Sequence, residues 1–267
     1  MVNYFLFTLL ALILLVIVIN RWLVTSIIYA INNNLTINGG FLSYMWIYKE
    51  VFFDKDYQTK QNLDNTIILD IGANVGVFSL WINDNYKNTT VYSFEPVPDL
   101  YKSTLENTKK CQKNNNHFIV NDFGLSNKNE DITIKYFPNA SGLSTAFHDI
   151  DDKEAAFGKM GNFLERQVWH AVTREQIDLN VKVRRIEDYL VENNINEVSL
   201  CKIDVEGSEE NILKGFGSKI NIVKEYIIEV ENYRPGVLNR MKNMLSNYDI
   251  DIDCSECQWT VMHAIRR

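Results

Sequence analysis

The sequence predicts an α/β fold in which a mostly parallel β-sheet is doubly wound, with helices on both of its faces. Short apolar runs alternate with helical segments from residue 66 onward, an order typical of parallel sheets with crossover helices. A glycine-containing turn follows the first apolar run, and an acidic residue ends the second. The length of 267 residues suits one such domain with an appendage.

The N-terminal residues differ in character from the rest. The run from Tyr4 to Ile19 carries no charge, and as a helix it would rise about 24 Å, against about 30 Å for the hydrocarbon core of a bilayer. We therefore predict a transmembrane or signal-anchor segment over residues 1–31, to which Trp22–Ile31 adds either length or an interfacial stretch. Neither a basic n-region nor an A-x-A-like site indicates a cleaved signal peptide. Arg21 follows the apolar run, so the positive-inside tendency predicts a single-pass membrane protein with a cytoplasmic catalytic domain.

Residues 32–65 are predicted to form a linker and a short helix before the main domain. An asparagine-rich joint comes first, and residues 41–53 are then aromatic and apolar. We expect this helix to pack on the domain, with a position at the lipid headgroups as the alternative.

The main domain is predicted to span residues 66–267. Strands are expected at 66–71, 90–95, 118–120, 181–185, 198–204 and 226–231, with a C-terminal antiparallel hairpin from 250–252 and 259–265. Helices are expected from the glycine turn through residue 82, and at 99–111, 186–193 and 207–216. An insertion over about 124–180 holds a strand at 132–136, a small polar loop at 141–145 and a helical stretch at 152–169. Insertions of this size usually carry contacts to the acceptor.

Composition argues against two kinds of site. The formal net charge of −7 and the lack of a basic stripe exclude a nucleic-acid partner, which needs clustered Lys and Arg. Cys254 and Cys257 lie close together, but no second pair of zinc ligands follows them. We expect these cysteines to be free thiols near the C-terminal hairpin, which fits a reducing compartment.

The turn from Asp70 to Gly76 is the strongest functional signal. Its glycines allow a ligand to approach the backbone, and the next helix offers free N–H groups. Asn74 stands where a dinucleotide-binding turn has its second glycine, which disfavours NAD. Asp70 is placed to meet an amine or a sulfonium, both present in S-adenosylmethionine, and Glu95 is placed to accept ribose hydroxyls. Each acid alone has a structural explanation, as a helix cap or an exposed strand end, but the whole pattern indicates an adenosine-containing cofactor.

Four blocks of the sequence resemble the FkbM-type methyltransferases. They are ILDIGANVGVFS (68–79), SFEPVP (93–98), RIEDYL (185–190) and LCKIDVEGSEENILKGF (200–216). The last block is the most specific, and the resemblance covers about residues 60–232. It implies a Rossmann-like class I methyltransferase fold that uses S-adenosylmethionine. It also implies O-methylation of a sugar, a glycan, or a lipid-linked or secondary-metabolite acceptor.

The resemblance further implies roles for individual residues. The residues expected to contact the cofactor are Asp70, Gly72, Ala73, Asn74, Gly76, Glu95, Pro96 and Asp204, with Asn121 or Asp122 at the adenine amino group. Asp204 ends the fourth core strand. Since the carboxyl edge of an open α/β sheet faces the ligand crevice, we expect Asp204 next to the transferred methyl group.

A hydroxyl acceptor must lose its proton during methyl transfer, so the site needs a base. The candidates are Asp204, Glu206, Glu231 or its neighbour Glu229, and His148 in the insertion. These carboxylates are also ligands that Mg²⁺ prefers, so a magnesium ion is the alternative to the metal-free base catalysis that we favour. Lys202 is expected to pair with one of the acids.

Two other functions stay open at this point. One is N-methylation of an amine or a protein in the same cofactor pocket. The other is a catalytically inactive, membrane-tethered binding or scaffold protein, against which the intact acids at Asp70, Glu95, Asp204 and Glu206 argue. The sequence specifies neither the acceptor nor the oligomeric state.

Overall fold

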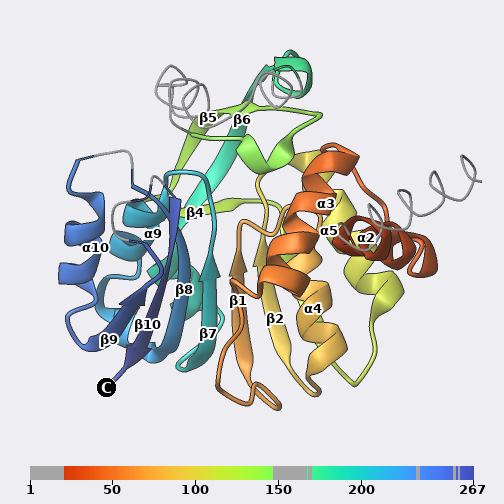
Figure 1. The fold of residues 1–267 in the computed structure, drawn as a ribbon. Coiled ribbons are helices and arrows are strands. Elements are labelled where there is room, and N and C mark those ends of the chain that lie inside the picture. Colours follow the sequence, from red (N-terminus) through yellow and green to blue (C-terminus); the bar gives the residue numbers. More distant parts are fainter. Residues whose placement is uncertain (1–20, 147–166, 168–169, 233–234, 255–256, 258) are drawn as a thin grey trace, which may run out of the picture.

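The computed structural model describes residues 21–146, 167, 170–232, 235–254, 257 and 259–267. Its main feature is a seven-stranded sheet with the strand order β3-β2-β1-β7-β8-β10-β9 (Figure 1). The strands are β1 (Ile67–Ile71), β2 (Thr90–Phe94), β3 (His117–Asn121), β7 (Val198–Ile203), β8 (Val223–Glu231), β9 (Tyr248–Ile252) and β10 (Trp259–Arg266). β10 runs antiparallel to both β8 and β9, and the other pairs are parallel. This arrangement confirms the predicted Rossmann-like α/β sheet with an antiparallel C-terminal hairpin.

Helices cover both faces of this sheet, as Figure 1 shows. One face holds α2 (Arg21–Asn32), α3 (Phe41–Lys49), α4 (Val77–Asn85) and α5 (Pro98–Cys111), with a π-helical turn η1 (Glu50–Asp54) after α3. The other face holds α8 (Ile186–Glu192), α9 (Glu209–Gly215), α10 (Val237–Met244) and the 3₁₀ turn η3 (Gly217–Ile222). α10 has no counterpart in the sequence-based prediction.

β1 is buried on both faces because its alternating side chains enter two separate cores. Leu69 and Ile71 pack with residues of α8, α9 and α10, whereas Ile68 packs with residues of α2 to α5. The same alternation places Tyr226 and Ile227 of β8 in opposite cores. A strand covered on both sides needs apolar residues at nearly every position, which is the pattern that identified these strands in the sequence.

The insertion forms a second, three-stranded sheet at one end of the domain (Figure 1). Its strands are β4 (Gly124–Ser126), β5 (Glu130–Tyr136) and β6 (Ile177–Arg185), in the order β4-β6-β5, and the 3₁₀ turn η2 (Ser141–Leu143) follows β5. The predicted strands at 132–136 and 181–185 are therefore confirmed, although β6 begins earlier. Nearly all of the helical stretch predicted at 152–169 lies outside the described residues.

The predicted membrane segment falls largely outside the described residues, which begin at Arg21. Within the part of the chain that the structure describes, no helix combines the length and the apolar character needed to cross a bilayer. The described part of the predicted segment, α2, packs on the domain through its buried residues Ser26 and Ala30. The half-buried Tyr29 side chain bridges the two helices, since its hydroxyl donates a hydrogen bond to Asp84 of α4 (2.8 Å).

The segment after α2 is tied to the sheet layer through Asn107 of α5, which is fully buried. Asn107 accepts a hydrogen bond from the backbone N–H of Thr36 (2.7 Å) and donates to the carbonyl oxygens of Thr36 and Val75 (both 2.9 Å). Residues predicted as a linker are thus fixed to the helices that flank the glycine turn.

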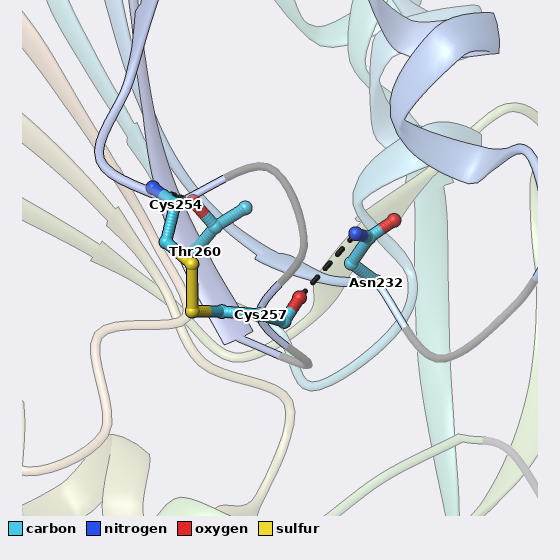
Figure 2. The surroundings of a disulfide bond; sticks show 4 residues. All are labelled: Asn232, Cys254, Cys257 and Thr260. Atoms are coloured by element: carbon cyan, nitrogen blue, oxygen red, sulfur yellow. Dashed lines mark hydrogen bonds between the residues drawn. A yellow bond between two sulfur atoms is a disulfide. The ribbon is translucent and has the colours of Figure 1, made fainter.

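Cys254 and Cys257 form a disulfide between β9 and β10 (Figure 2). The prediction of free thiols at these positions is therefore wrong. The two Cα atoms lie 5.4 Å apart, which is an ordinary spacing for a disulfide. Asn232 donates a hydrogen bond to the Cys257 carbonyl (3.3 Å), and the Cys254 N–H donates to the Thr260 hydroxyl (3.2 Å). With these thiols paired, they give no support for a reducing compartment.

Replacing Asn107 with alanine should lower the free energy of unfolding by about 2–3 kcal/mol, because buried backbone groups of Thr36 and Val75 lose their partner. Urea denaturation of the full chain in mild detergent measures this loss. The control is Lys109→Ala, an exposed position on the same helix, which should change stability by less than about 0.5 kcal/mol. Equal losses in the two variants would contradict the assigned role of Asn107.

Candidate functional site

The glycine turn lies at the carboxyl end of β1 and connects it to α4. Gly72, Asn74 and Gly76 all adopt left-handed backbone conformations, with φ of 81°, 51° and 86°. Asparagine is among the few residues with a side chain that tolerate this region, which explains its place between two glycines. The turn therefore presents its backbone to the space above the sheet.

Gly72 lies against the end of β7. A Cβ atom at this position would sit 1.8 Å from the carbonyl oxygen of Asp204. Any other residue would force β1 and β7 apart at the edge where the two loops meet. The sequence needs glycine here because of this close approach as well as the positive φ.

Glu95 lies beneath the same turn and is only 5% exposed. Its two carboxylate oxygens accept hydrogen bonds from the backbone N–H groups of Asn74 (2.8 Å) and Val97 (2.9 Å). Burial raises the pKa of Glu95 to about 7, and the two N–H donors partly oppose that rise. Each oxygen retains a second lone pair, so the carboxylate can still accept hydroxyl protons from a ligand.

Lys202 of β7 places a buried ammonium group at the centre of the site. Its Nζ donates to the Gly72 carbonyl oxygen (2.6 Å) and lies 3.2 Å from Asp204 and 3.5 Å from Asp70. Burial alone would lower the pKa of Lys202, but Asp204 and Asp70 raise it, so the group stays charged. The prediction that Lys202 pairs with a neighbouring acid is confirmed.

A group of acidic side chains surrounds the hydroxyl of Tyr57, which is buried. This hydroxyl lies 3.0 Å from Glu229 and 3.3 Å from Asp204. Desolvation and the nearby charge of Asp204 raise the pKa of Glu229 to about 8. Desolvation also raises the pKa of Glu50, on the π-helical turn, and Glu229 and Asp204 add to that rise. Lys202 is thus outnumbered by carboxylates, so at least one of them holds a proton near neutral pH.

The sheet register explains why Glu229 reaches this group. Ile203 of β7 pairs with Ile228 of β8, so Asp204 and Glu229 follow at the same level on neighbouring strands. Glu231 lies two residues further on, where β8 pairs with Trp259 of β10. Glu231 is buried there and does not line the site.

Most of these groups, though not Asp70 or Glu231, border one cavity of about 990 Å³. Its floor is the carboxyl edge of the sheet, with Gly72, Asn74, Glu95, Lys202 and Asp204. One wall comes from α3 and η1, with Leu42, Trp46, Ile47, Glu50 and Val51. A second wall comes from the insertion, with Ile132, Ile134, Ser141, Leu143 and Val183. The volume is at the upper end of the range for ligand sites, roughly 300–1,000 Å³.

Most of the predicted site residues border the cavity. They are Gly72, Ala73, Asn74, Glu95, Pro96, Asp204 and Glu206. The polar loop at 141–145 also reaches it, and the Ser141 hydroxyl lies 3.1 Å from the side-chain oxygen of Asn74. This contact joins the insertion directly to the glycine turn.

Other predicted residues lie elsewhere among the described residues. Asp70 is fully buried beneath the turn, where the Ser79 hydroxyl donates to it (2.7 Å), so it supports the turn and does not border the cavity. Gly76 packs against Thr104 of α5. Asn121 uses its side chain to hold Ser93 and Tyr189, and Asp122 is exposed outside the cavity.

His148 lies outside the described residues.

The segment before β1 also lines the cavity, which was not predicted from the sequence. Glu50 and Tyr57 border the cavity, yet they belong to residues 32–65, which were predicted as a linker and a helix. The available signal was Glu50 itself, a lone acid between aromatic and apolar residues. His170 of the insertion also borders the cavity.

The magnesium ion considered as an alternative gains no support from the geometry. Within the described residues, no group of three or more His, Cys, Asp or Glu side chains is arranged to hold a metal ion. To bind a metal ion together, Asp204 and Glu229 would have to come closer to each other. The Tyr57 hydroxyl lies between them, and the Lys202 ammonium already pairs with Asp204.

Comparison with known proteins gives a match to one family model. Residues 70–249 match the model described as the methyltransferase FkbM domain. The matched range begins at the glycine turn and includes the carboxylates of β7 and β8.

Two curated relatives are similar over most of their length. The methyltransferase sdnD of Sordaria araneosa is 28% identical over 226 residues, which cover 80% of this chain and 85% of that protein. The 31-O-demethyl-FK506 methyltransferase FkbM of Streptomyces tacrolimicus is 26% identical over 180 residues, which cover 64% of this chain and 67% of that protein. Among solved structures, a methyltransferase FkbM from Methylobacillus flagellatus aligns with a TM-score of 0.46 at 15% identity, over 90% of this chain and 60% of that one.

Substituting Gly72 with alanine should weaken cofactor binding at least tenfold, equivalent to about 1.4 kcal/mol, because the added Cβ displaces the Asp204 carbonyl. Gly236→Ala is the matched control, since Gly236 also has a positive φ, of 73°, but lies outside the cavity, and its Cβ would meet the flexible Arg240 guanidinium at 3.2 Å. Calorimetric titration with S-adenosylmethionine compares the variants. Full affinity in Gly72→Ala would show that the close approach of β1 and β7 is not needed.

Proposed function

Because the chain belongs to the FkbM methyltransferase family and is an S-adenosylmethionine-dependent methyltransferase, we propose that it methylates a hydroxyl group of a sugar, a glycan, or a lipid-linked or secondary-metabolite acceptor. The observation that supports this proposal best is the position of Glu229. This carboxylate, whose pKa is raised to about 8, borders the same cavity as the glycine turn.

The residues at the glycine turn fit the cofactor. Gly72 leaves the space that a Cβ would fill, and the carboxylate of Glu95 is available for ribose hydroxyls at the end of β2. Asp204 supplies a negative charge beside the turn that suits the cationic methionine part. When bound, S-adenosylmethionine supplies a methyl group on a sulfonium, which is transferred by in-line displacement.

The chain's own residues then have two tasks, alignment and proton removal. Alignment contributes much of the acceleration in a displacement reaction, and the walls formed by α3 and the insertion restrict how an acceptor can lie. For proton removal, we assign Glu229 as the general base. Its raised pKa matches the pH at which it must work, and the Tyr57 hydroxyl holds the carboxylate in place.

One relative supports a hydroxyl acceptor, because its name describes a methyltransferase for a 31-O-demethyl compound. N-methylation is the second candidate, and the excess of carboxylates over Lys202 favours it, since a cationic amine would be attracted to them.

Incubation with labelled cofactor and cell fractions distinguishes hydroxyl acceptors from amine acceptors. Label in lipid or polysaccharide supports the hydroxyl acceptor, and label confined to protein or amines overturns it.

Cofactor binding should depend on Glu95. Glu95→Ala is expected to weaken the binding of S-adenosylmethionine at least about tenfold, because a charged acceptor for the ribose hydroxyls is lost. Asp122→Ala, at an exposed carboxylate near the end of β3, should change affinity less than about twofold. Similar losses in both variants, measured by calorimetry, would remove Glu95 from the cofactor site.

The same contact predicts a pH dependence. The ribose hydroxyls donate to the ionised carboxylate, and the pKa of Glu95 is about 7. Protonation competes with binding, so affinity should rise as the pH increases from below to above this value and level off beyond it. Glu95→Gln should have lower affinity and should lose this slope. If the affinity of the variant still rises with pH, the pH dependence belongs to a group other than Glu95.

Glu229→Gln should reduce methyl transfer to the labelled fraction by roughly 10²–10⁴-fold while cofactor affinity changes little. In the wild type, the rate should rise with pH through about 8, because the base must be ionised, and this limb should vanish in the variant. Glu231→Gln is the matched comparison on the same strand, outside the cavity. A larger loss of transfer in Glu231→Gln than in Glu229→Gln would reverse the assignment.

A further inference from the structure

Two helices near the N-terminus expose apolar side chains to solvent. Among the described residues, six of the eleven exposed large apolar side chains lie on α2 and α3. They are Ile27, Ile28 and Ile31 on α2, with Ile31 71% exposed, and Phe41, Leu42 and Trp46 on α3, with Trp46 57% exposed. Single exposed apolar residues are normal on any protein, but a concentration on two neighbouring helices marks a surface that interacts. We call these six residues the α2–α3 surface.

The fold holds this surface in place. Ser26 and Ala30 are buried on α2, and the Tyr44 hydroxyl of α3 donates to the Ser26 carbonyl oxygen (2.8 Å) within the protein. The exposed isoleucines of α2 follow the spacing i, i+1 and i+4, so they share one side of the helix. α2 therefore turns one side toward the domain and leaves a second, apolar side uncovered.

The α2–α3 surface continues into the cavity. Leu42 and Trp46, one helical turn apart, are exposed and also border the cavity. Ile47 and Val51 continue the apolar wall inward, and Glu50 lies on the same wall. A ligand that enters past Leu42 and Trp46 meets apolar side chains before it reaches the carboxylates.

We infer that the α2–α3 surface rests on a lipid bilayer and that the cavity receives from it an acceptor with an apolar chain. The second half of this inference rests on the proposed function. It narrows the acceptor to a lipid whose hydroxyl lies at its polar end, as in a lipid-linked sugar. That hydroxyl reaches Glu229, and the chain leaves past Leu42 and Trp46.

Two observations favour lipid over a protein partner. The uncharged run Tyr4–Ile19 ends immediately before α2, so the surface is continuous in sequence with residues suited to a bilayer. The Lys49 ammonium lies 5.2 Å from the ring centroid of Trp46. Tryptophan and lysine are both favoured at the headgroup level of membranes, and the Lys49 ammonium pairs with Asp54 in this position.

Trp46 also provides the test. The full chain is reconstituted into phosphatidylcholine vesicles, and the emission of Trp46 is obtained as the difference between wild type and Trp46→Phe. Helices lying in the interface bury their apolar face by about 5–10 Å, so lipids brominated near the headgroup should quench this emission at least about twofold more than lipids brominated near the chain end. Aqueous iodide should quench it weakly. The difference obtained with Trp81→Phe, at a residue packed against Phe78 and Tyr86, serves as the lipid-insensitive control.

A charged variant tests the surface itself. Ile28→Lys/Ile31→Lys should reduce quenching of Trp46 by brominated lipid about twofold, because two charges oppose contact with the bilayer. Val191→Lys, at a residue 58% exposed on α8, should leave quenching unchanged. Neither variant touches the cavity, so calorimetry should find the same affinity for S-adenosylmethionine in both.

The outcomes separate this inference from the proposed function. Quenching of Trp46 by iodide and not by bromine would overturn the bilayer contact. Shielding from both quenchers together with a doubled molar mass would instead assign the surface to a second copy of the chain. Transfer of label to a water-soluble acceptor alone would overturn the lipid acceptor while leaving the hydroxyl methyltransferase intact. Absence of transfer to any hydroxyl-bearing fraction would remove the proposed function whatever the quenching result.

Discussion

The ammonium group of Lys202 connects the structural and chemical parts of the site. It is buried at the carboxyl edge of the sheet, where it donates to the Gly72 carbonyl and lies close to both Asp70 and Asp204. A buried charge is costly unless it is paired and hydrogen-bonded, and these three partners meet that need. The same contacts bind the glycine turn to the end of β7. The geometry of the turn and the electrostatics of the cavity therefore depend on one side chain.

The surplus of acids around this lysine shapes the chemistry. Glu50, Asp204 and Glu229 come from three separate parts of the chain. Asp204 and Glu229 both lie beside the Tyr57 hydroxyl, and their charges add to the rise in the pKa of Glu50 that burial causes. With one cation among them, the carboxylates cannot all be ionised at neutral pH. Burial first, and then the charge of Asp204, raise the pKa of Glu229 to about 8, which suits this glutamate to exchange protons with an acceptor. The insertion and α3 enclose this group in a largely apolar cavity, which strengthens its interactions.

The sheet, the glycine turn and the position of Glu95 near it could be predicted because each leaves a local pattern. Strands buried on both faces are continuous apolar runs, and a close backbone approach demands glycine. Asp70 shows the limit of such reasoning. It follows Ile68 by two residues and so faces the same side of β1, where α4 covers it. Glu50 and Tyr57 could not be placed, since only tertiary packing brings the N-terminal helices over the sheet edge. The spacing of Cys254 and Cys257 likewise fits either free thiols or a disulfide.

The central claim is that the cofactor and the acceptor meet above Asp204 and Glu229. A crystal structure of the full chain with S-adenosylhomocysteine tests it most directly. We expect both ribose hydroxyls at hydrogen-bond distance from Glu95, within about 3.2 Å, and the sulfur directed toward the space in front of Glu229. A ligand bound with its sulfur facing away from these carboxylates, or outside the cavity, would contradict the account.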